Sequence, residues 1–333
     1  MKKSINCGKG GNGVTVNEEY FLPTREIVIE NTTCCGAECL ICPRESYQLP
    51  LRHMGMNLFK EVVEQAVGLG LASLDVSGFG DAFMDPLFES KLAYVKLKYP
   101  NIKIYTSTTC HLLNEEKIKM VCKFIDTLKI SNLGFTKEVY EKVHRGSLEF
   151  EKVSKNIGSL LSIPDNQRPY IIMLFVVVKE NEHQIEEWKK YWEPKVDEIM
   201  IWLPHNFGVG RDYVNMKELK RQGLKPKTCG RPFKGNYFVR ANGEVSVCCF
   251  DYNHQLIIGD LKRSTLKEIL LGEALQKIQR VHKEKPIEQS DYICKNCEQI
   301  YPREHALLYS NNSSRNAGVI TSHSDLINIL TSD

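Results

Sequence analysis

Hydrophobic and polar positions change period repeatedly between residues 25 and 210, and each change predicts a switch between strand and helix. Short apolar or alternating runs predict the strands Glu26–Glu30, Ser73–Ser77, Lys103–Ser107, Thr127–Ser131, Tyr170–Val178 and Asp197–Leu203. Apolar residues at helical spacing predict the helices Leu58–Leu69, Pro86–Lys98, Asn114–Cys122, Lys137–Val143, Phe150–Leu161 and His183–Tyr191. Repeated strand–helix units imply a parallel sheet with right-handed crossovers. Six units are too few for an eight-unit barrel, so the pattern predicts an α/β fold with a partial (β/α)6 barrel open on one side.

The pattern changes after Gly210. A charged connector at 211–223 precedes two short strands around Asn242-Gly243, which predict a β-hairpin, and Leu266–Val281 predicts a helix. We therefore divide the chain into a lead-in (1–24), the partial barrel (25–210), a smaller β-hairpin/helix module (211–304) and a peripheral C-terminal tail (305–333).

Composition narrows the class of protein. The chain has 333 residues with 44 Lys plus Arg and 41 Asp plus Glu, and a net charge of +3 gives no argument for a nucleic-acid partner. The longest apolar run, Ile171–Val178, has eight residues and is too short to span a membrane. The first residues contain no apolar signal segment, so we expect a cytoplasmic protein.

Nine of the twelve cysteines lie in two groups, and Cys7, Cys110 and Cys122 stand alone. Without an export signal, disulfides are not expected, and grouped thiols in a reducing compartment indicate metal binding. The first group contains Cys34, Cys35, Cys39 and Cys42, and the second contains Cys229, Cys248, Cys249, Cys294 and Cys297.

Three thiols of the first group follow the first predicted strand with the spacing Cys35-x3-Cys39-x2-Cys42. Three thiolates on one short loop can each bind one iron of a 4Fe–4S cluster and leave the fourth iron without a protein ligand. Zinc is the alternative, although zinc sites favour four protein ligands. The segment resembles the CxxxCxxC loop of the radical S-adenosylmethionine (SAM) superfamily. This resemblance implies that the open iron binds SAM and that one electron cleaves SAM to a 5′-deoxyadenosyl radical, which abstracts hydrogen from a substrate.

Three further segments resemble motifs of that superfamily in the same order along the chain. Gly78-Phe79-Gly80-Asp81 is similar to the glycine loop that meets the SAM amino group, with Asp in place of the usual Glu. Thr108–Leu113 is similar to the TNGxLL segment, with Thr109 and Cys110 in place of Asn and Gly. Ser131 and Arg145 correspond to positions that face SAM, and an Arg suits its carboxylate; an ordinary surface Arg in a turn is the alternative. The SAM-binding candidates implied by the resemblance are Gly78, Gly80, Asp81, Thr109, Ser131 and Arg145.

The second group contains a four-thiol set, Cys229, Cys248, Cys294 and Cys297. Four thiolates on a small hairpin and a following loop suit a fully ligated 4Fe–4S cluster, and a structural zinc site is the alternative. The surrounding segments resemble the auxiliary-cluster module known as SPASM in its shortened "twitch" form. No cysteine follows Cys297, so the resemblance implies one auxiliary cluster, as in the 2-deoxy-scyllo-inosamine dehydrogenase type.

Three residues outside these ligand sets are candidates for catalysis. Cys249 and Cys110 are possible hydrogen-atom donors, and a buried small apolar role is the alternative for both. His205 ends the sixth predicted strand and is a candidate base or substrate contact, with a packed loop histidine as the alternative.

These observations together predict an oxidoreductase or epimerase of the radical SAM type, with SAM and two 4Fe–4S clusters as cofactors. The expected substrate is a sugar, polyol or aminocyclitol, and the expected reductant is a flavodoxin- or ferredoxin-type protein. A peptide-modifying enzyme and a zinc-stapled binding module without enzymatic activity are the competing hypotheses.

Overall fold

A computed structural model describes most of the chain. The described residues are 22–208, 225–226, 228–235, 237–284, 287–301 and 306–315. The predicted lead-in and most of the predicted tail therefore lie outside the described residues.

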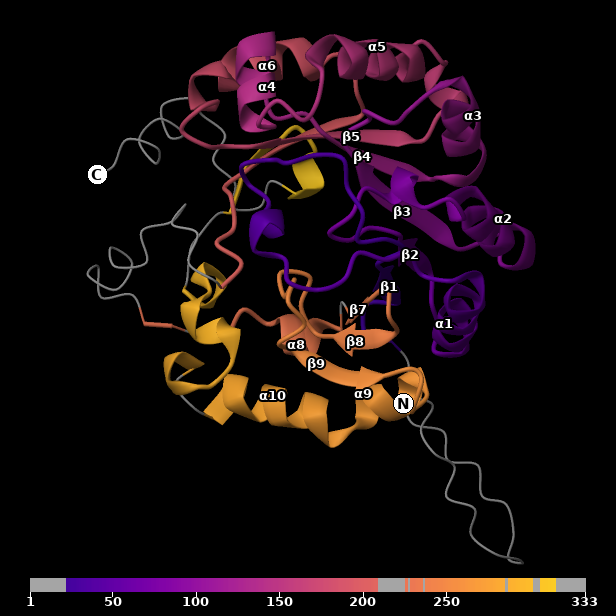
Figure 1. Ribbon diagram of the computed structural model, residues 1–333, viewed down its shortest axis with the longest axis vertical. Coiled ribbons are helices and arrows are strands. Elements are labelled where there is room, and N and C mark those ends of the chain that lie inside the picture. The colour runs from indigo at the N-terminus through magenta and orange to yellow at the C-terminus, as the bar shows by residue number, and fades with distance from the viewer. Residues whose placement is uncertain are drawn as a thin grey trace, which may run out of the picture.

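Six parallel strands form the barrel part of one ten-stranded sheet, with the order β10-β6-β5-β4-β3-β2-β1-β7-β8-β9. These strands are β1 (Glu26–Ile29), β2 (Ser73–Asp75), β3 (Lys103–Thr108), β4 (Thr127–Ser131), β5 (Tyr170–Val176) and β6 (Glu198–Trp202). The main helices between them are α1 (Met56–Gly68), α2 (Phe88–Lys98), α3 (Glu115–Phe124), α4 (Lys137–Val143), α5 (Phe150–Leu161) and α6 (Ile185–Trp192). The helices form an outer arc around the curved sheet (Figure 1). The predicted partial (β/α)6 barrel is confirmed.

The C-terminal module continues the same sheet. β7 (Tyr237–Val239) pairs in parallel with β1, and β8 (Glu244–Ser246) and β9 (Ile257–Asp260) follow in antiparallel order. α9 (Leu266–Leu271) and α10 (Glu273–Glu284) lie below these strands, and the short helix α8 (Arg231–Lys234) lies beside them (Figure 1). The predicted hairpin is confirmed, and Gly243 takes the positive φ of 95° that its turn needs.

Three features of this region differ from the predictions. The single helix expected at Leu266–Val281 is two helices, because Gly272 has an extended backbone. β9 is not predicted. β10 (Leu307–Ser310), in the segment expected to be a peripheral tail, pairs antiparallel with β6 and forms an edge of the sheet. β9 and β10 each have only four residues, and so short an apolar pattern does not identify a strand in the sequence.

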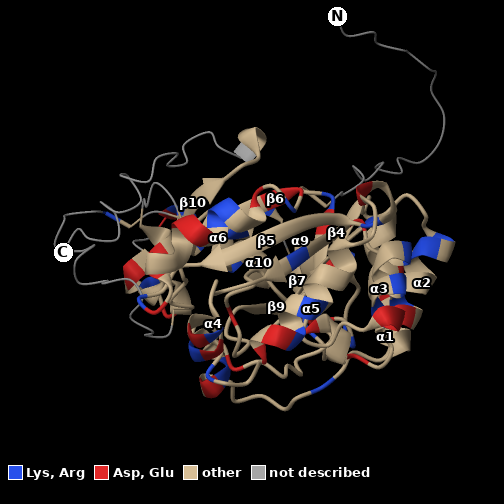
Figure 2. Cartoon of the chain, turned by 90° about the horizontal axis from the view of Figure 1, so that it is seen from above, with Lys and Arg blue, Asp and Glu red and all other residues tan. Residues whose placement is uncertain are grey.

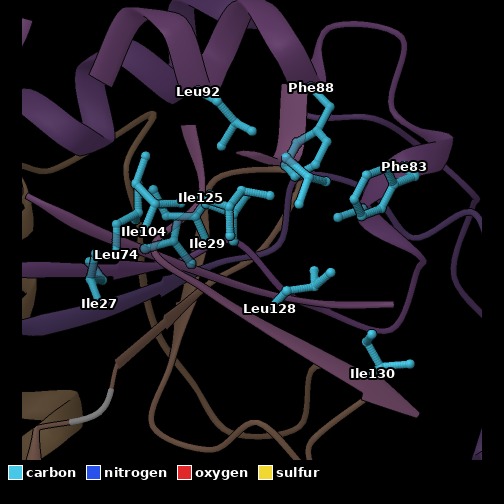
Figure 3. Close-up of a cluster of buried hydrophobic side chains, with 14 of the residues drawn as sticks. Ile27, Ile29, Leu74, Phe83, Phe88, Leu92, Ile104, Ile125, Leu128 and Ile130 are labelled. Atoms are coloured by element: carbon cyan, nitrogen blue, oxygen red, sulfur yellow. The ribbon is translucent and has the colours of Figure 1, made fainter. Parts of the chain in front are cut away.

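The main core lies between the sheet and the helices. In β1, Ile27 and Ile29 are fully buried, whereas Glu26 and Val28 are partly exposed on the opposite face. Figure 3 shows the strand residues Ile27, Ile29, Leu74, Ile104, Leu128 and Ile130 together with Phe88 and Leu92 of α2. Burial of each of these aliphatic side chains stabilises the folded state by about 1.5–3 kcal/mol. The sheet therefore has an apolar outer face, and its inner face is free to carry polar side chains.

A buried ion pair lies behind the loop that follows β1. Lys91 of α2 and Asp85 have fully buried side chains, with 2.5 Å between Nζ and Oδ2. Lys91 also donates to the Met54 carbonyl at 2.6 Å, and Asn31 Nδ2 donates to Asp85 at 3.2 Å. Burial lowers the pKa of Lys91, and the hydrogen bond to Asp85 opposes that effect. The pair fixes Asn31, from which the cysteine loop begins.

Charged side chains lie on the outer surfaces of helices such as α2, α3 and α5 (Figure 2). Among the described residues, no helix combines the length and the apolar composition needed to cross a membrane.

We predict that Asp85→Ala lowers the free energy of unfolding by roughly 3–5 kcal/mol, because it leaves the Lys91 ammonium buried without a partner. Lys98→Ala is the control, since it removes a pair with Glu64 whose side chains are about half exposed and should change stability little. Urea titrations followed by circular dichroism would measure both variants. Equal losses in the two variants would contradict the role given to the buried pair.

Candidate functional site

The three cysteines of the first group lie on the loop that leaves the carboxyl end of β1. Cys35, Cys39 and Cys42 are all half-buried and free of disulfides. The Cys42 amide donates to the Cys39 carbonyl at 3.0 Å, which closes a turn between these two residues. Ligands of open α/β sheets bind at the carboxyl ends of parallel strands, and the loop occupies that end.

The glycine loop after β2 packs directly against the cysteine loop. The Asp81 amide donates to the Cys34 carbonyl at 2.9 Å. A Cβ added to Gly80 would lie 2.5 Å from the carbonyl oxygens of both Thr32 and Cys34. Only a glycine allows this close approach of two backbones. Packing alone therefore requires glycine at position 80, whether or not a ligand binds there.

Asp81 joins the glycine loop to the segment after β3. It is almost fully buried and accepts hydrogen bonds from Phe83 N at 3.0 Å, Thr108 Oγ1 at 2.8 Å and Thr109 N at 3.3 Å. Its carboxylate therefore already has several protein donors. A role for Asp81 toward SAM stays a prediction, and its structural role is to position Thr109.

His111, which no sequence motif indicates as a site residue, extends this connection to the cysteine loop. Its Nδ1 lies 2.7 Å from Thr109 Oγ1, and its Nε2 lies 2.8 Å from where a Cβ on Gly36 would be. Gly36 follows Cys35 directly, so the imidazole supports the backbone between two cysteines. A histidine in a loop carries no sequence signal for such a contact.

Cys110 follows the same strand and has a φ of 63°, the left-handed region that favours glycine. Cys110 occupies the Gly position of the TNGxLL segment that this stretch resembles, and its positive φ is a conformation that glycine adopts readily. The Cys110 side chain has no exposed surface, and burial raises the pKa of its thiol. The structure thus places Cys110 in the core, which disfavours its predicted role as a hydrogen-atom donor.

The end of α4 holds the other side of the cysteine loop. Leu40 N donates to the Val143 carbonyl at 2.8 Å, and Glu38 N donates to Ser147 Oγ at 2.8 Å. Arg145, with a φ of 52°, pairs with Glu45 at 2.6 Å and remains partly exposed. The segments identified by resemblance are therefore brought together around one loop. Ser131 ends β4 on the inner face of the sheet.

The thiols of this loop fit a cationic metal cluster. Burial raises the pKa of Cys35 and Cys39, and the neighbouring cysteines raise that of Cys39 further. Grouped buried thiols of this kind form stable thiolates only when a positive charge compensates them, and bound metal supplies that charge. The donor set thus matches iron–sulfur ligation, which uses thiolates.

The four cysteines of the second group line one hollow of the C-terminal module. Cys229, Cys248, Cys294 and Cys297 lie around it together with apolar residues and Arg231. Burial, followed by the effects of Cys248 and Cys229, raises the pKa of Cys294 to about 12. Within the described residues, no three His, Cys, Asp or Glu side chains are placed to hold a single metal ion. The four thiols surround a space, and this arrangement fits a cluster.

His205 and Cys249 lie beside this hollow. His205 Nδ1 is 2.9 Å from the Glu298 carboxylate, and its ring lies 4.1 Å from that of Phe250. Glu298 follows Cys297, so His205 connects the end of the barrel to the cysteine loop of the module. Cys249 is half-buried, and Arg231 Nη1 donates to its Sγ at 3.7 Å.

A buried junction joins the two cysteine regions. The Glu30 carboxylate, at the end of β1, accepts hydrogen bonds from Phe79 N at 3.2 Å and Ala241 N at 3.3 Å. Arg240 is fully buried 3.9 Å from Glu30 and donates from Nη2 to the Cys248 carbonyl at 3.2 Å. The glycine loop and the strand end that carries Cys248 therefore contact the same ion pair.

The inner face of the sheet lines an open, partly polar cavity of about 740 Å³. Asp75 and Lys129 form an ion pair in it at 3.3 Å, and Ser77 Oγ lies 3.3 Å from Ser107 Oγ at the adjacent strand ends. A space of this size suits a small ligand.

Comparisons with known proteins agree with this description. Residues 229–298 match the SPASM iron–sulfur cluster-binding domain. The chain is similar in structure to BtrN in complex with AdoMet and 2-DOIA (15% identity, TM-score 0.61, covering 84% of this chain and 94% of that chain). It is also similar to native anSMEcpe with bound AdoMet (15%, 0.60, 76% and 82%) and to Streptococcus suis SuiB bound to precursor peptide SuiA (14%, 0.62, 85% and 70%). No curated protein matches the sequence. The chain therefore shares the fold of these structures, and its C-terminal module matches an iron–sulfur cluster-binding domain.

We predict that Gly80→Ala separates the glycine loop from the cysteine loop, because its new methyl group would overlap two carbonyl oxygens. Reconstituted protein should then retain less iron than the wild type and melt at a lower temperature. Gly68→Ala is the matched control, since no atom lies within 4 Å of its added Cβ. Wild-type iron content and melting temperature in Gly80→Ala would contradict the proposed packing.

Proposed function

We propose that this protein is a radical SAM enzyme that removes hydrogen from a carbinol carbon of a sugar, polyol or aminocyclitol. The main supporting observation is the three-cysteine loop at the carboxyl end of the sheet, packed against the glycine loop, the segment after β3 and the end of α4. A second, four-cysteine site lies in a module whose first strand pairs with β1.

A 4Fe–4S cluster bound by Cys35, Cys39 and Cys42 would, with SAM, supply a 5′-deoxyadenosyl radical. The chain's own residues position the components. Gly80 packs against the backbone of the cysteine loop, Gly78 of the same glycine loop lies against Glu30, and Asp81 holds Thr109 in place. Arg145 presents a partly exposed guanidinium that now pairs with Glu45. The same guanidinium can pair with the SAM carboxylate in place of Glu45. Ser131 offers a hydroxyl from the end of β4.

The inner face of the barrel supports a small polar substrate. Asp75 and Lys129 offer both an acceptor and a donor, and the Ser77 hydroxyl donates to Asp75 and lies beside the Ser107 hydroxyl. Such groups can pair with the hydroxyl or amino groups of a polyol or aminocyclitol. BtrN, whose structure contains 2-DOIA, provides a comparable fold.

Dehydrogenation of a carbinol carbon would remove one hydrogen atom, one proton and one electron from the substrate. One electron would be consumed in cleaving SAM to methionine and the adenosyl group, and the substrate carbon would give that group one hydrogen atom to form 5′-deoxyadenosine. The substrate then loses one proton and one electron and becomes a ketone. A four-thiolate auxiliary cluster would accept that electron, and a flavodoxin- or ferredoxin-type protein would supply the first one. Epimerisation would instead return a hydrogen atom to the carbon, for which Cys249 is the remaining accessible candidate.

A peptide substrate is the second candidate, because SuiB bound to a precursor peptide has a similar fold. Incubation with SAM, a reductant and a panel of aminocyclitols or short peptides would separate the two classes by which compounds increase 5′-deoxyadenosine formation.

We predict that changing Cys35, Cys39 and Cys42 together to Ala abolishes 5′-deoxyadenosine formation under dithionite, because the SAM-cleaving cluster has no ligands. Two cubanes imply about eight irons per chain, so this variant should retain about four. Chromatography of the nucleoside and iron analysis would measure both effects. The Cys122→Ala variant is the control, since that thiol is outside both groups.

Two results would contradict this assignment. Normal 5′-deoxyadenosine formation by the triple variant would remove the SAM-cleaving role. Wild-type protein that never exceeds about four irons and contains zinc would replace the auxiliary cluster by a structural zinc site.

We predict that turnover in deuterated buffer gives a ketone two mass units lighter than the substrate and that Cys249→Ala leaves this product unchanged. Thiol protons exchange with water, so epimerisation would place one deuterium on the product carbon and would be lost in Cys249→Ala. Mass spectrometry of the product distinguishes the outcomes. A deuterated epimer from the wild type would contradict the dehydrogenase assignment.

A further inference from the structure

Arg231 is the one cationic side chain that lines the hollow formed by the four cysteines of the C-terminal module, among the described residues. Gly230, which follows Cys229, has a φ of 77°, and this turn directs the start of α8 toward the hollow. The side chain therefore follows a predicted cluster ligand by two residues and faces the other three across the same space.

The contacts of Arg231 are unusual for a half-buried arginine. Its Nη1 donates to Cys249 Sγ at 3.7 Å, and its guanidinium carbon lies 4.5 Å from the centre of the Phe250 ring. Within the described part of the chain, no carboxylate is paired with Arg231. Other shielded arginines do have acidic partners: Arg168 pairs with Asp165 and Asp197. A charge removed from water is costly unless an opposite charge compensates it.

The cysteines supply that opposite charge. A cubane held by four thiolates carries net negative charge, and its total charge becomes one unit more negative when it gains an electron. A fixed cation nearby therefore stabilises the reduced form more than the oxidised form. Net charge and hydrogen bonds at the sulfurs are among the factors that set cluster potentials.

We propose that Arg231 is the counter-charge of the auxiliary cluster and raises its reduction potential, so that the cluster accepts an electron from the substrate more readily. This inference rests on the proposed function for the presence of the cluster. Arg231 is a positioning residue in this scheme, since it acts on the substrate only through the cluster. Cys249 orients the guanidinium.

The test is a potentiometric titration of the full chain with both clusters, followed by electron paramagnetic resonance. Repeating it with the Cys35/Cys39/Cys42 alanine variant identifies the signal of the auxiliary cluster. Arg231→Gln should move the auxiliary midpoint to a more negative potential, and Arg231→Lys should retain most of the wild-type value. Arg263→Gln is the control, because Arg263 is an exposed arginine of the same module and should leave the midpoint unchanged.

Each outcome is decisive. An unchanged midpoint in Arg231→Gln with full iron content would overturn the proposal, and so would loss of the cluster in both Arg231 variants, which would indicate a packing role. Loss of the cluster in Arg231→Gln alone would support it, because the retained Lys charge would be what keeps the cluster bound. Wild-type protein with zinc and no auxiliary signal would be a failure of the proposed function instead, and would be recognised by metal analysis.

Discussion

The Glu30–Arg240 pair stands where the barrel and the C-terminal module become one sheet. β1 pairs with β2 on one side and with β7 on the other, so the end of β1 has backbone neighbours from both parts of the chain. Glu30 accepts the amides of Phe79 and Ala241 there, and Arg240 donates to the carbonyl of Cys248. A buried pair of this kind is strongly disfavoured once one partner is missing. It therefore fixes the glycine loop and the strand end that carries Cys248 to a common point.

Aromatic side chains fill the space beside this junction. Phe79 of the glycine loop contacts Tyr252 and Phe207, and Phe207 contacts Phe250 next to the second cysteine group. The Arg231 guanidinium lies over the Phe250 ring. Packed rings exclude water and lower the local dielectric constant, which strengthens each charge effect in the region. The proposed influence of Arg231 on a cluster depends on this dry environment.

The cysteine loop is held by contacts from three separate strand–helix units. Gly80 and Asp81 contact it after β2, His111 contacts it after β3, and Val143 and Ser147 contact it at and just beyond the end of α4. Most of these contacts involve backbone atoms of the loop, so they leave the thiols available for metal.

The amino-acid sequence by itself determined the strand–helix alternation, the partial barrel and the membership of both cysteine groups, because periodicity and ligand spacing are local properties. It also indicated the β-hairpin, since Asn242-Gly243 specifies its own turn. Only the tertiary structure decided that β7 continues the barrel sheet, that Leu307–Ser310 returns to β6, and that Cys110 is buried while Arg231 faces the four thiols. These facts depend on contacts between residues far apart in the chain, such as Glu30 with Ala241, and no local pattern encodes which distant segments meet.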